Sequence, residues 1–148
     1  MQTAKQISAF LVNKPGRLAA ICSALAKEKI NIHALTVMDS QEQSVLRLVT
    51  DDIARTKEVM NRLGSPFTET EVLRVEMQNR PGALARVCER LGAEHVNIDY
   101  AYCSAGTKNG KTLGIFKVSS LPKALKVLAE RNHVTRREQP TRRPTFSR

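Results

Sequence analysis

Two copies of the string Asn-x-Pro-Gly, residues 13–16 and 79–82, contain the residues best suited to chemistry. Each string follows a β-prone run and precedes an amphipathic helical pattern, so each lies where a strand turns into a helix. The first N–H groups of a helix have no intrahelical partner, and with the helix dipole they form a site for a carboxylate. Asn13 and Asn79 add a neutral side chain that can donate and accept hydrogen bonds. The two strings therefore predict two sites for a small ligand that resembles an amino acid.

We expect each ligand to contact the turn, the first helical residues and the residues that open the next strand. The predicted binding residues are Asn13, Pro15, Gly16, Arg17, Leu18, Asn31, Ile32, Asn79, Pro81, Gly82, Ala83, Leu84, Asn97 and Ile98. The prolines and glycines would shape the turn in any case and would touch a ligand only through their backbone. Other roles remain open, because Asn13 and Asn79 could simply cap the turn, and Asn31 and Asn97 could simply end a helix.

The two strings belong to an internal repeat. Residues 13–32 and 79–98 align without a gap at an offset of 66, and ten of the twenty positions are identical. Unrelated segments of ordinary composition would share about one or two. The chain therefore contains a duplication, and each copy is expected to hold its turn in the same way.

Hydrophobic periodicity gives the elements that position the turns. In the first copy it predicts strands at 7–12, 33–38, 44–50 and 67–71, with a helix after the turn and a second helix near residues 51–52. In the second copy it predicts strands at 72–78, 99–104, 112–119 and near 133–137. The helix after each turn has an apolar stripe, which begins at Leu18 in the first copy and at Leu84 in the second. Matching Pro122 to Ile53 predicts that the second copy is three residues longer between its second and third strands.

This order of elements predicts an α+β protein with two tandem βαββαβ units of the ferredoxin-like type. Each unit has an antiparallel sheet with both helices on one face. The predicted boundaries are residues 5–71 for the first unit and 72–137 for the second. Residues 138–148 are predicted to be a disordered basic tail.

Composition excludes several kinds of protein. No apolar run approaches 18 residues and no signal peptide is evident, so we expect a cytoplasmic protein without a membrane span. The three cysteines lack metal-ligand or disulfide spacing, and neither a metal nor a cofactor is expected. The net charge is +10, but residues 131–148 hold six arginines against one glutamate, a balance of +5. Half of the excess positive charge therefore lies at the C-terminal end of the chain.

The repeated residues also resemble those of the ACT domain family, the amino-acid-sensing modules attached to many biosynthetic enzymes. The resemblance covers about residues 5–135 and is carried by Asn13, Pro15, Gly16, Leu18 and Asn31-Ile32, and by Asn79, Pro81, Gly82, Leu84 and Asn97-Ile98. It implies a free-standing tandem ACT protein with no catalytic domain. It also implies that a regulated enzyme acts as a separate partner.

The resemblance further implies how a ligand is held. Two ACT units associate through the edges of their second strands into one continuous sheet, and the effector lies between the first turn of one unit and the second strand of its neighbour. Asn13 and Asn79 match the turn asparagine that contacts ligand in serine-sensing members, and Asn31 and Asn97 match the asparagine opposite. Leu11 and Met77 stand where those members carry histidine, which leaves the identity of the amino acid open.

Three functions follow from these features. The leading prediction is a non-catalytic regulatory protein that binds an amino acid between ACT-like units and forms a homodimer, since units this small have strand edges that need covering. Nucleic-acid binding is the alternative, suggested by the basic charge and by Tyr100 and Tyr102 on one face of a strand. An enzyme is not expected, because the sequence shows no nucleophile with a base and no paired catalytic carboxylates.

Overall fold

The computed structural model describes residues 2–12, 14–39, 43–104 and 109–129. In chain order the elements are β1 (Gln2–Val12), α1 (Arg17–Lys27), β2 (Ile32–Asp39), β3 (Gln43–Thr50), α2 (Ile53–Arg62), β4 (Phe67–Gln78), α3 (Ala83–Ala93), β5 (Ile98–Ser104), β6 (Lys111–Val118) and α4 (Leu121–Ala129). The predicted fold class, an α+β protein of βαββαβ-type units, is confirmed. The predicted strand near 133–137 and the predicted tail at 138–148 lie outside the described residues.

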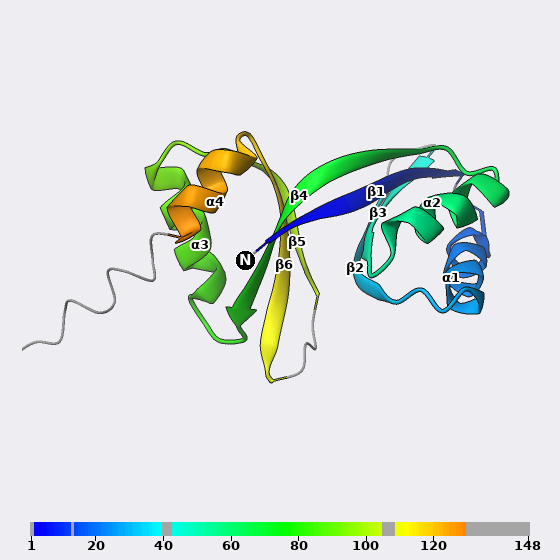
Figure 1. Cartoon of the computed structure of the whole chain (residues 1–148), viewed down its shortest axis with the longest axis horizontal. Helices are drawn as coiled ribbons and strands as arrows, with labels where there is room; N and C mark the ends of the chain where they lie inside the picture. The colour runs from blue at the N-terminus through cyan, green and yellow to red at the C-terminus, as the bar shows by residue number, and fades with distance from the viewer. Residues whose placement is uncertain (1, 13, 40–42, 105–108, 130–148) are drawn as a thin grey trace, which may run out of the picture.

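All six described strands form one antiparallel sheet in the order β2-β3-β1-β4-β6-β5. Figure 1 shows α1 and α2 at one end of the molecule and α3 and α4 at the other. Residues 71 and 72, which flank the predicted boundary between the units, are consecutive members of β4. The predicted strands 67–71 and 72–78 are therefore a single long strand.

The two copies share strands at their junction. The first half of β4 pairs with β1 from Ala9↔Phe67 to Lys5↔Glu71, which completes the sheet of the first copy. The pairing then continues through Gln2↔Arg74, so the beginning of β1 lies beside the second copy's first strand. In the first copy, the equivalent edge of β1 is where the fourth strand pairs. Residues 2–5 of the chain therefore occupy much of the place expected for a fourth strand in the second copy.

Alternation along the strands divides the apolar residues between two faces. On the helix-bearing face of the first copy, Ile7, Ala9 and Leu11 pack with α1 and α2. On the equivalent face of the second copy, Leu73, Val75 and Met77 pack with α3 and α4. A third cluster lies between the helix-free faces and contains Ala34, Val49, Val72, Leu113 and Ile115. The sheet therefore bends so that the helix-free faces of the two copies pack against each other.

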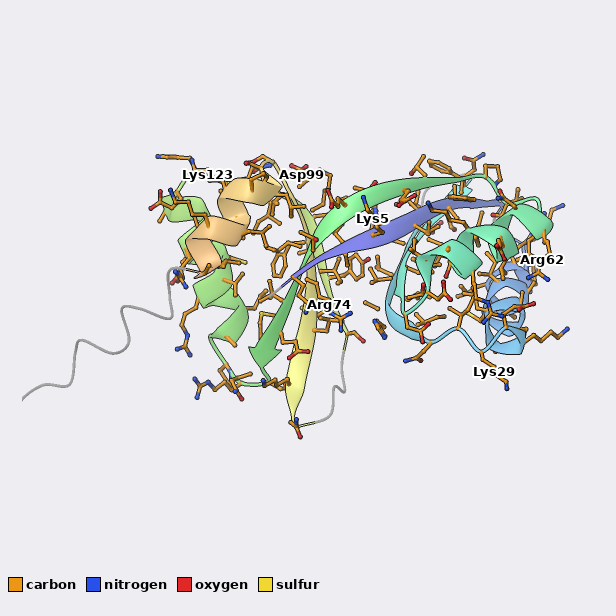
Figure 2. All side chains as sticks on the ribbon, in the orientation of Figure 1. Lys5, Lys29, Arg62, Arg74, Asp99 and Lys123 are labelled. Atoms are coloured by element: carbon orange, nitrogen blue, oxygen red, sulfur yellow. The ribbon has the colours of Figure 1, made fainter. Side chains whose placement is uncertain are left out.

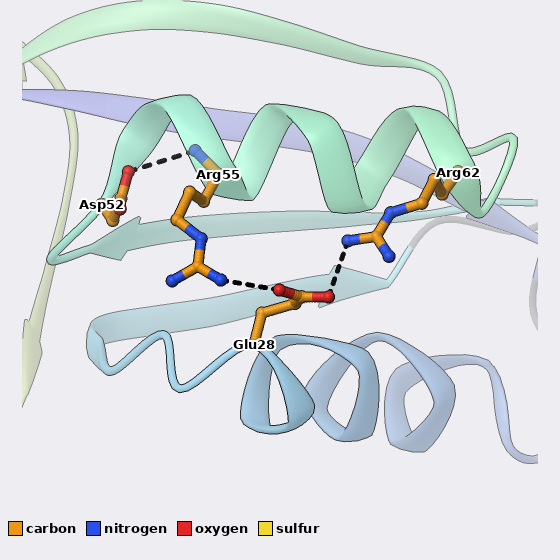
Figure 3. Close-up of polar contacts among 4 residues, drawn as sticks. All are labelled: Glu28, Asp52, Arg55 and Arg62. Carbon is orange, nitrogen blue, oxygen red and sulfur yellow. Dashed lines mark hydrogen bonds and ion pairs between the residues drawn. The ribbon is translucent and has the colours of Figure 1, made fainter.

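Charged side chains help to hold α1 against α2. The Glu28 carboxylate at the end of α1 accepts hydrogen bonds from Arg55 (2.7 Å) and Arg62 (3.0 Å) of α2, as Figure 3 shows. These two guanidinium groups hold the pKa of Glu28 below its ordinary value, with the Arg62 hydrogen bond as the largest cause. The Asp52 carboxylate accepts from the Arg55 N–H (3.1 Å) and caps α2.

The apolar stripes of the first helices are only partly as predicted. Ile21 and Leu25 are buried, but Leu18 is 37% exposed and Leu84, its equivalent, is 45% exposed. In the first copy all of residues 14–20 are exposed, so the start of α1 stands clear of the sheet. Leu18 and Leu84 lie on the predicted apolar stripes and are also predicted binding residues, and the structure leaves both exposed.

The repeat also needs a smaller insertion than predicted. The Asp51 N–H donates to the Asn31 carbonyl, and the Ser119 N–H makes the equivalent bond to Asn97. Residues 51 and 119 are thus equivalent at an offset of 68, which matches α2 beginning at Ile53 to α4 beginning at Leu121. The second copy is therefore two residues longer, not three.

Candidate functional site

The two turns have the same geometry. Gly16 and Gly82 are the N-cap residues of α1 and α3, with φ of 84° and 85°, in the left-handed region that glycine reaches without a Cβ clash. Before each glycine the backbone makes the same short contact: Lys14 N–H donates to the Val12 carbonyl (2.8 Å), and Arg80 N–H donates to the Gln78 carbonyl (2.9 Å). The duplication in sequence is therefore a duplication in backbone conformation.

The start of each helix is electrostatically positive. Glycine has no side chain to cap the helix, so the N-cap supplies no acceptor for the first N–H groups. Neither α1 nor α3 has an acidic residue in its first turn, although carboxylates are favoured there. Lys14 and Arg17 flank the first turn, and Arg80 flanks the second. These helix termini have the donors and the charge to hold a carboxylate.

The predicted turn residues lie together at the surface in each copy. Pro15, Gly16, Arg17 and Leu18 are all exposed, as are Pro81, Gly82 and Leu84, whereas Ala83 is half-buried against the core. Asn79 is exposed and its N–H donates to the Gly110 carbonyl (3.3 Å). Asn13 lies outside the described residues. The N–H groups of Arg17 and Ala83 donate to the carbonyls of Lys14 (3.4 Å) and Arg80 (3.3 Å), and neither helix has a side-chain cap. The exposed leucine beside the positive helix N-terminus gives each turn an apolar part as well as a positive one.

Asn31 and Asn97 hold the start of the second strand against the end of the third. The Asn31 N–H donates to the Asp51 carboxylate (3.0 Å), and the Asn97 N–H donates to the Ser119 hydroxyl (3.0 Å). The Asn97 side chain also donates to Asp99 (2.9 Å). Ile32 and Ile98 follow, and both are half-buried against the cores. The backbone bonds of both asparagines are thus structural.

Within one chain the structure does not bring the turns to these asparagines. Each turn is separated from the asparagine of its own copy by an eleven-residue helix, about 16 Å in length. The turns follow Val12 and Gln78, which lie at opposite ends of the antiparallel β1–β4 pair. Figure 1 accordingly places α1 and α3 far apart. The copies are joined through β1 and β4 and not through the edges of their second strands, which the resemblance implies for associated units.

A polar cluster that the sequence did not reveal lies between the helix-free faces. Gln6 of β1 is fully buried; its amide donates to the Tyr100 hydroxyl (2.7 Å) and accepts from the Tyr102 hydroxyl (2.7 Å). The Arg47 guanidinium lies 4.0 Å from the centre of the Tyr100 ring. Burial, with a smaller contribution from Tyr100, raises the pKa of Tyr102. No sequence signal marks Gln6, because its partners are 94 and 96 residues away.

A second pair crosses the same junction. Arg74 of β4 and Nδ1 of His33 in β2 are 3.0 Å apart, and Figure 2 shows Arg74 at the middle of the molecule.

Because Tyr100 and Tyr102 bond Gln6 and Tyr100 also contacts Arg47, both tyrosines are occupied by contacts between the copies. Neither forms an open platform on which a base could stack. This arrangement removes the aromatic feature that suggested nucleic-acid binding.

The described residues offer little for other chemistry. Among them, no three His, Cys, Asp or Glu side chains are grouped so as to hold a metal ion. No helix within the described ranges is long and apolar enough to cross a membrane. Burial raises the pKa of the Cys103 thiol, which disfavours its nucleophilic form.

Comparison with known protein families identifies the duplicated unit. The family model for an ACT domain pair matches residues 2–139. The chain belongs to this family. The match covers nearly the whole chain, and the predicted family is thus confirmed. A search of curated proteins gave no match.

Solved structures agree with this assignment. The ACT domain pair is similar to protein BT0572 from Bacteroides thetaiotaomicron, with 35% sequence identity and a TM-score of 0.81, over 88% of this chain and 89% of that one. The regulatory subunit of aspartate kinase from Thermus thermophilus, in its ligand-free form, matches with 14% identity and a TM-score of 0.62, over 85% and 90% of the two chains. The Thermus flavus subunit matches with 16% identity and a TM-score of 0.59, over 88% and 96%. At such identities the likeness to the aspartate kinase subunits is one of fold.

Proposed function

We propose that this ACT domain pair is a non-catalytic regulatory protein that binds an amino acid at its two turns and alters the activity of a separate enzyme. The observation that carries the proposal is the repeated turn itself, with φ of 84° and 85° at the two N-cap glycines. Uncapped N–H groups and basic neighbours suit an α-carboxylate. Asn13 and Asn79 supply neutral donors and acceptors for an amino group.

The exposed leucines support a small organic ligand over an inorganic anion. Leu18 and Leu84 occupy equivalent positions in the two helices, and both remain exposed where periodicity favours burial. A bound molecule that covers them removes apolar area from water, at about 25 cal/mol per Å². An amino acid offers a carboxylate for the N–H groups and an aliphatic surface for the leucine.

A second chain would complete each site. Within one chain the turns lie at opposite ends of the β1–β4 pair, so neither turn meets the other copy's second strand. The second strands β2 and β5 are the outermost strands of the sheet. Exposed strand edges favour pairing with another chain. A homodimer joined along these edges would place Asn79 of one chain near Asn31 or Asn97 of its partner.

The related structures suggest the kind of partner. Two of them are described as regulatory subunits of aspartate kinase. By analogy, the enzyme regulated by this chain belongs to amino-acid metabolism and acts in trans. The compartment in which both act is predicted from the sequence to be the cytoplasm.

Calorimetric titration of the chain with each of the twenty amino acids tests the proposal. We expect at least one to bind below millimolar concentration. Asn13→Ala with Asn79→Ala should weaken that binding, whereas Asn61→Ala, an exposed asparagine on α2, should leave it unchanged. Light scattering in the same samples should give the mass of a dimer. Absence of binding by all twenty amino acids would overturn the proposal.

A further inference from the structure

An apolar row lies on the helix-free face of the first copy, beyond the junction between the copies. Phe10 of β1 is opposite Val45 of β3, and Met38 of β2 is opposite Val45 from the other side. Residues opposite each other point to the same face of a sheet, and the neighbours of Phe10 along β1 pack with the helices on the other face. Phe10 is 46% exposed, Met38 is 50% exposed, and Val12, the next residue of β1 on this face, is 46% exposed. The four side chains therefore form one continuous apolar patch.

The equivalent row of the second copy is apolar only where it is covered. There Glu76 of β4 and Ser104 of β5 lie opposite Leu113 of β6. Leu113 is buried in the third cluster, against residues of the first copy, whereas Glu76 is exposed and Ser104 is half-buried. Large exposed apolar patches mark surfaces that meet another molecule. Apolar side chains at all three places in the first copy thus indicate a row that is covered by something outside the chain.

The apolar row continues the face by which the two copies already meet. Between it and the third cluster lies one further row, formed by Ser8, Arg47 and Thr36. The Arg47 guanidinium lies 4.0 Å from the centre of the Tyr100 ring, and its Nη1 donates to the Met38 sulfur (3.3 Å). Arg47 therefore connects the junction to the apolar row. Within this chain, one helix-free face is covered by another helix-free face, and the uncovered row lies directly beside that contact.

The charge of this face favours a second copy of the chain as its occupant. The chain carries a net charge of +10, so most surfaces of two chains repel each other. Among the described residues of this outer face, the charged side chain is Arg47, which already lies over Tyr100. The others are uncharged: Phe10, Val12, Thr36, Met38, Gln43, Val45 and Thr68. Two such faces can meet with little like-charge repulsion, and neither has the charges that would select an acidic partner.

We propose that the helix-free face of the first copy packs on the same face of a second chain about a twofold axis. Phe10 and Met38 of one chain pack against the partner's equivalent patch, and Val12 and Val45 complete the apolar centre. An isologous contact of this kind needs one self-complementary patch on each chain. Three half-exposed side chains make a smaller patch than a standard interface, which buries about 800 Å² per partner. We therefore expect a weak contact with a dissociation constant between about 1 µM and 1 mM.

Sedimentation velocity of the full chain over that concentration range tests the contact. The double variant Phe10→Glu with Met38→Ser gives the first copy the residues that the second copy carries in the same row. We expect it to halve the mass of the largest species that the unmodified chain forms. The added glutamate lowers the net charge and so reduces general repulsion between chains, which means that a smaller species reports the lost contact. An unmodified chain that stays monomeric up to about 1 mM would overturn the proposal.

A matched control makes the same change of charge elsewhere. Leu63 is 39% exposed at the end of α2, on the helix-bearing side of the same copy. We expect Leu63→Glu to associate as the unmodified chain does. The far-ultraviolet circular dichroism of both variants should match that of the unmodified chain. If the double variant associates no less than the control does, the face is not an interface.

A tryptophan reporter locates the contact without removing it. The sequence contains no tryptophan, so Phe10→Trp introduces a single one and keeps an aromatic ring in the patch. Its emission should shift to shorter wavelength as the chain concentration rises through the association range, because the ring leaves water. Leu63→Trp should show no such shift. A shift in both variants, or in neither, would contradict contact through this face.

This contact and a dimer joined along the edges of β2 or β5 give different results. An edge contact does not involve the outward-pointing side chains of Phe10 and Met38, so it survives the double variant. A chain with both contacts therefore changes from a tetramer to a dimer, and a chain with the edge contact alone stays a dimer, which would refute the proposal. The measurements need no amino acid, so this contact and amino-acid binding can succeed or fail separately.

Discussion

Replacing Gln6 by leucine should destabilise the whole chain, because Gln6 connects the two copies. Its fully buried amide makes two 2.7 Å hydrogen bonds to Tyr100 and Tyr102 and a longer one, 3.3 Å, to Ser8. Leucine fills a similar volume but leaves both phenolic hydroxyls without their buried partner. Each orphaned group costs about 1–3 kcal/mol, and the added apolar burial offsets part of that. We expect Gln6→Leu to lower the free energy of unfolding by about 2–4 kcal/mol.

Urea denaturation followed by far-ultraviolet circular dichroism measures this loss. With an m-value of about 2 kcal/mol/M, the midpoint should fall by about 1–2 M while the m-value is unchanged. Gln2→Leu, at an exposed glutamine on the same strand, should change stability by less than about 0.5 kcal/mol. Adding Tyr100→Phe and Tyr102→Phe to Gln6→Leu should restore about 1–2 kcal/mol, because both orphaned phenolic hydroxyls are then removed.

Two results would refute this reasoning. A loss below about 1 kcal/mol for Gln6→Leu would show that the cluster contributes little to stability. A triple variant no more stable than Gln6→Leu alone would show that the tyrosine hydroxyls are not coupled to Gln6. Two separate unfolding transitions in Gln6→Leu would instead show that the copies had been uncoupled, which would support a joining role.

Three further predictions concern single groups. The pKa of Glu28 is lowered in the fold from an ordinary 4.5, so its stabilising effect is present above that pH and is lost as the pH falls through the lowered pKa. Denaturation curves of Glu28→Gln and the unmodified chain should therefore converge on acidification below pH 4.5. Because burial raises the pKa of Tyr102, the Tyr100→Phe variant should show no phenolate absorbance at 295 nm at pH 11 until it unfolds. Gly82→Ala should cost about 1–2 kcal/mol, because its φ of 85° is left-handed, whereas Gly92→Ala inside α3 should stabilise by about 0.5–1 kcal/mol in thermal unfolding.

Local pattern was sufficient to predict the helices and strands that the structure describes around each turn. The duplicated turn, the spacing of Ile21 and Leu25, and the β-prone runs all depend on neighbours in sequence, and the structure has them where the periods indicate. Leu18 and Leu84 depart from the pattern because periodicity gives the direction of a side chain but not whether anything lies opposite it. Both leucines follow the helical period at a point where no other element covers them.

The junction between the copies could not be read in the same way. Residues 2–6 show no apolar alternation, and they are a strand because β4 pairs with them from about 70 residues away. Gln6 is buried for the same reason, since its tyrosine partners come from β5. Such pairings follow from how two sheets meet, and no local preference encodes them.

The shared strands also connect the two turns mechanically. The first turn follows the end of β1, and the beginning of β1 lies beside the second copy's first strand; the second turn follows the end of β4, and the beginning of β4 completes the first copy's sheet. Each turn therefore follows a strand whose beginning is hydrogen-bonded in the opposite half of the molecule. Because each of these strands continues into both halves, we expect a shift of one turn along its strand to move backbone in the other half as well. β1 and β4 are thus antiparallel strands that each belong to both sheets, so a ligand that shifts either turn would act on both copies.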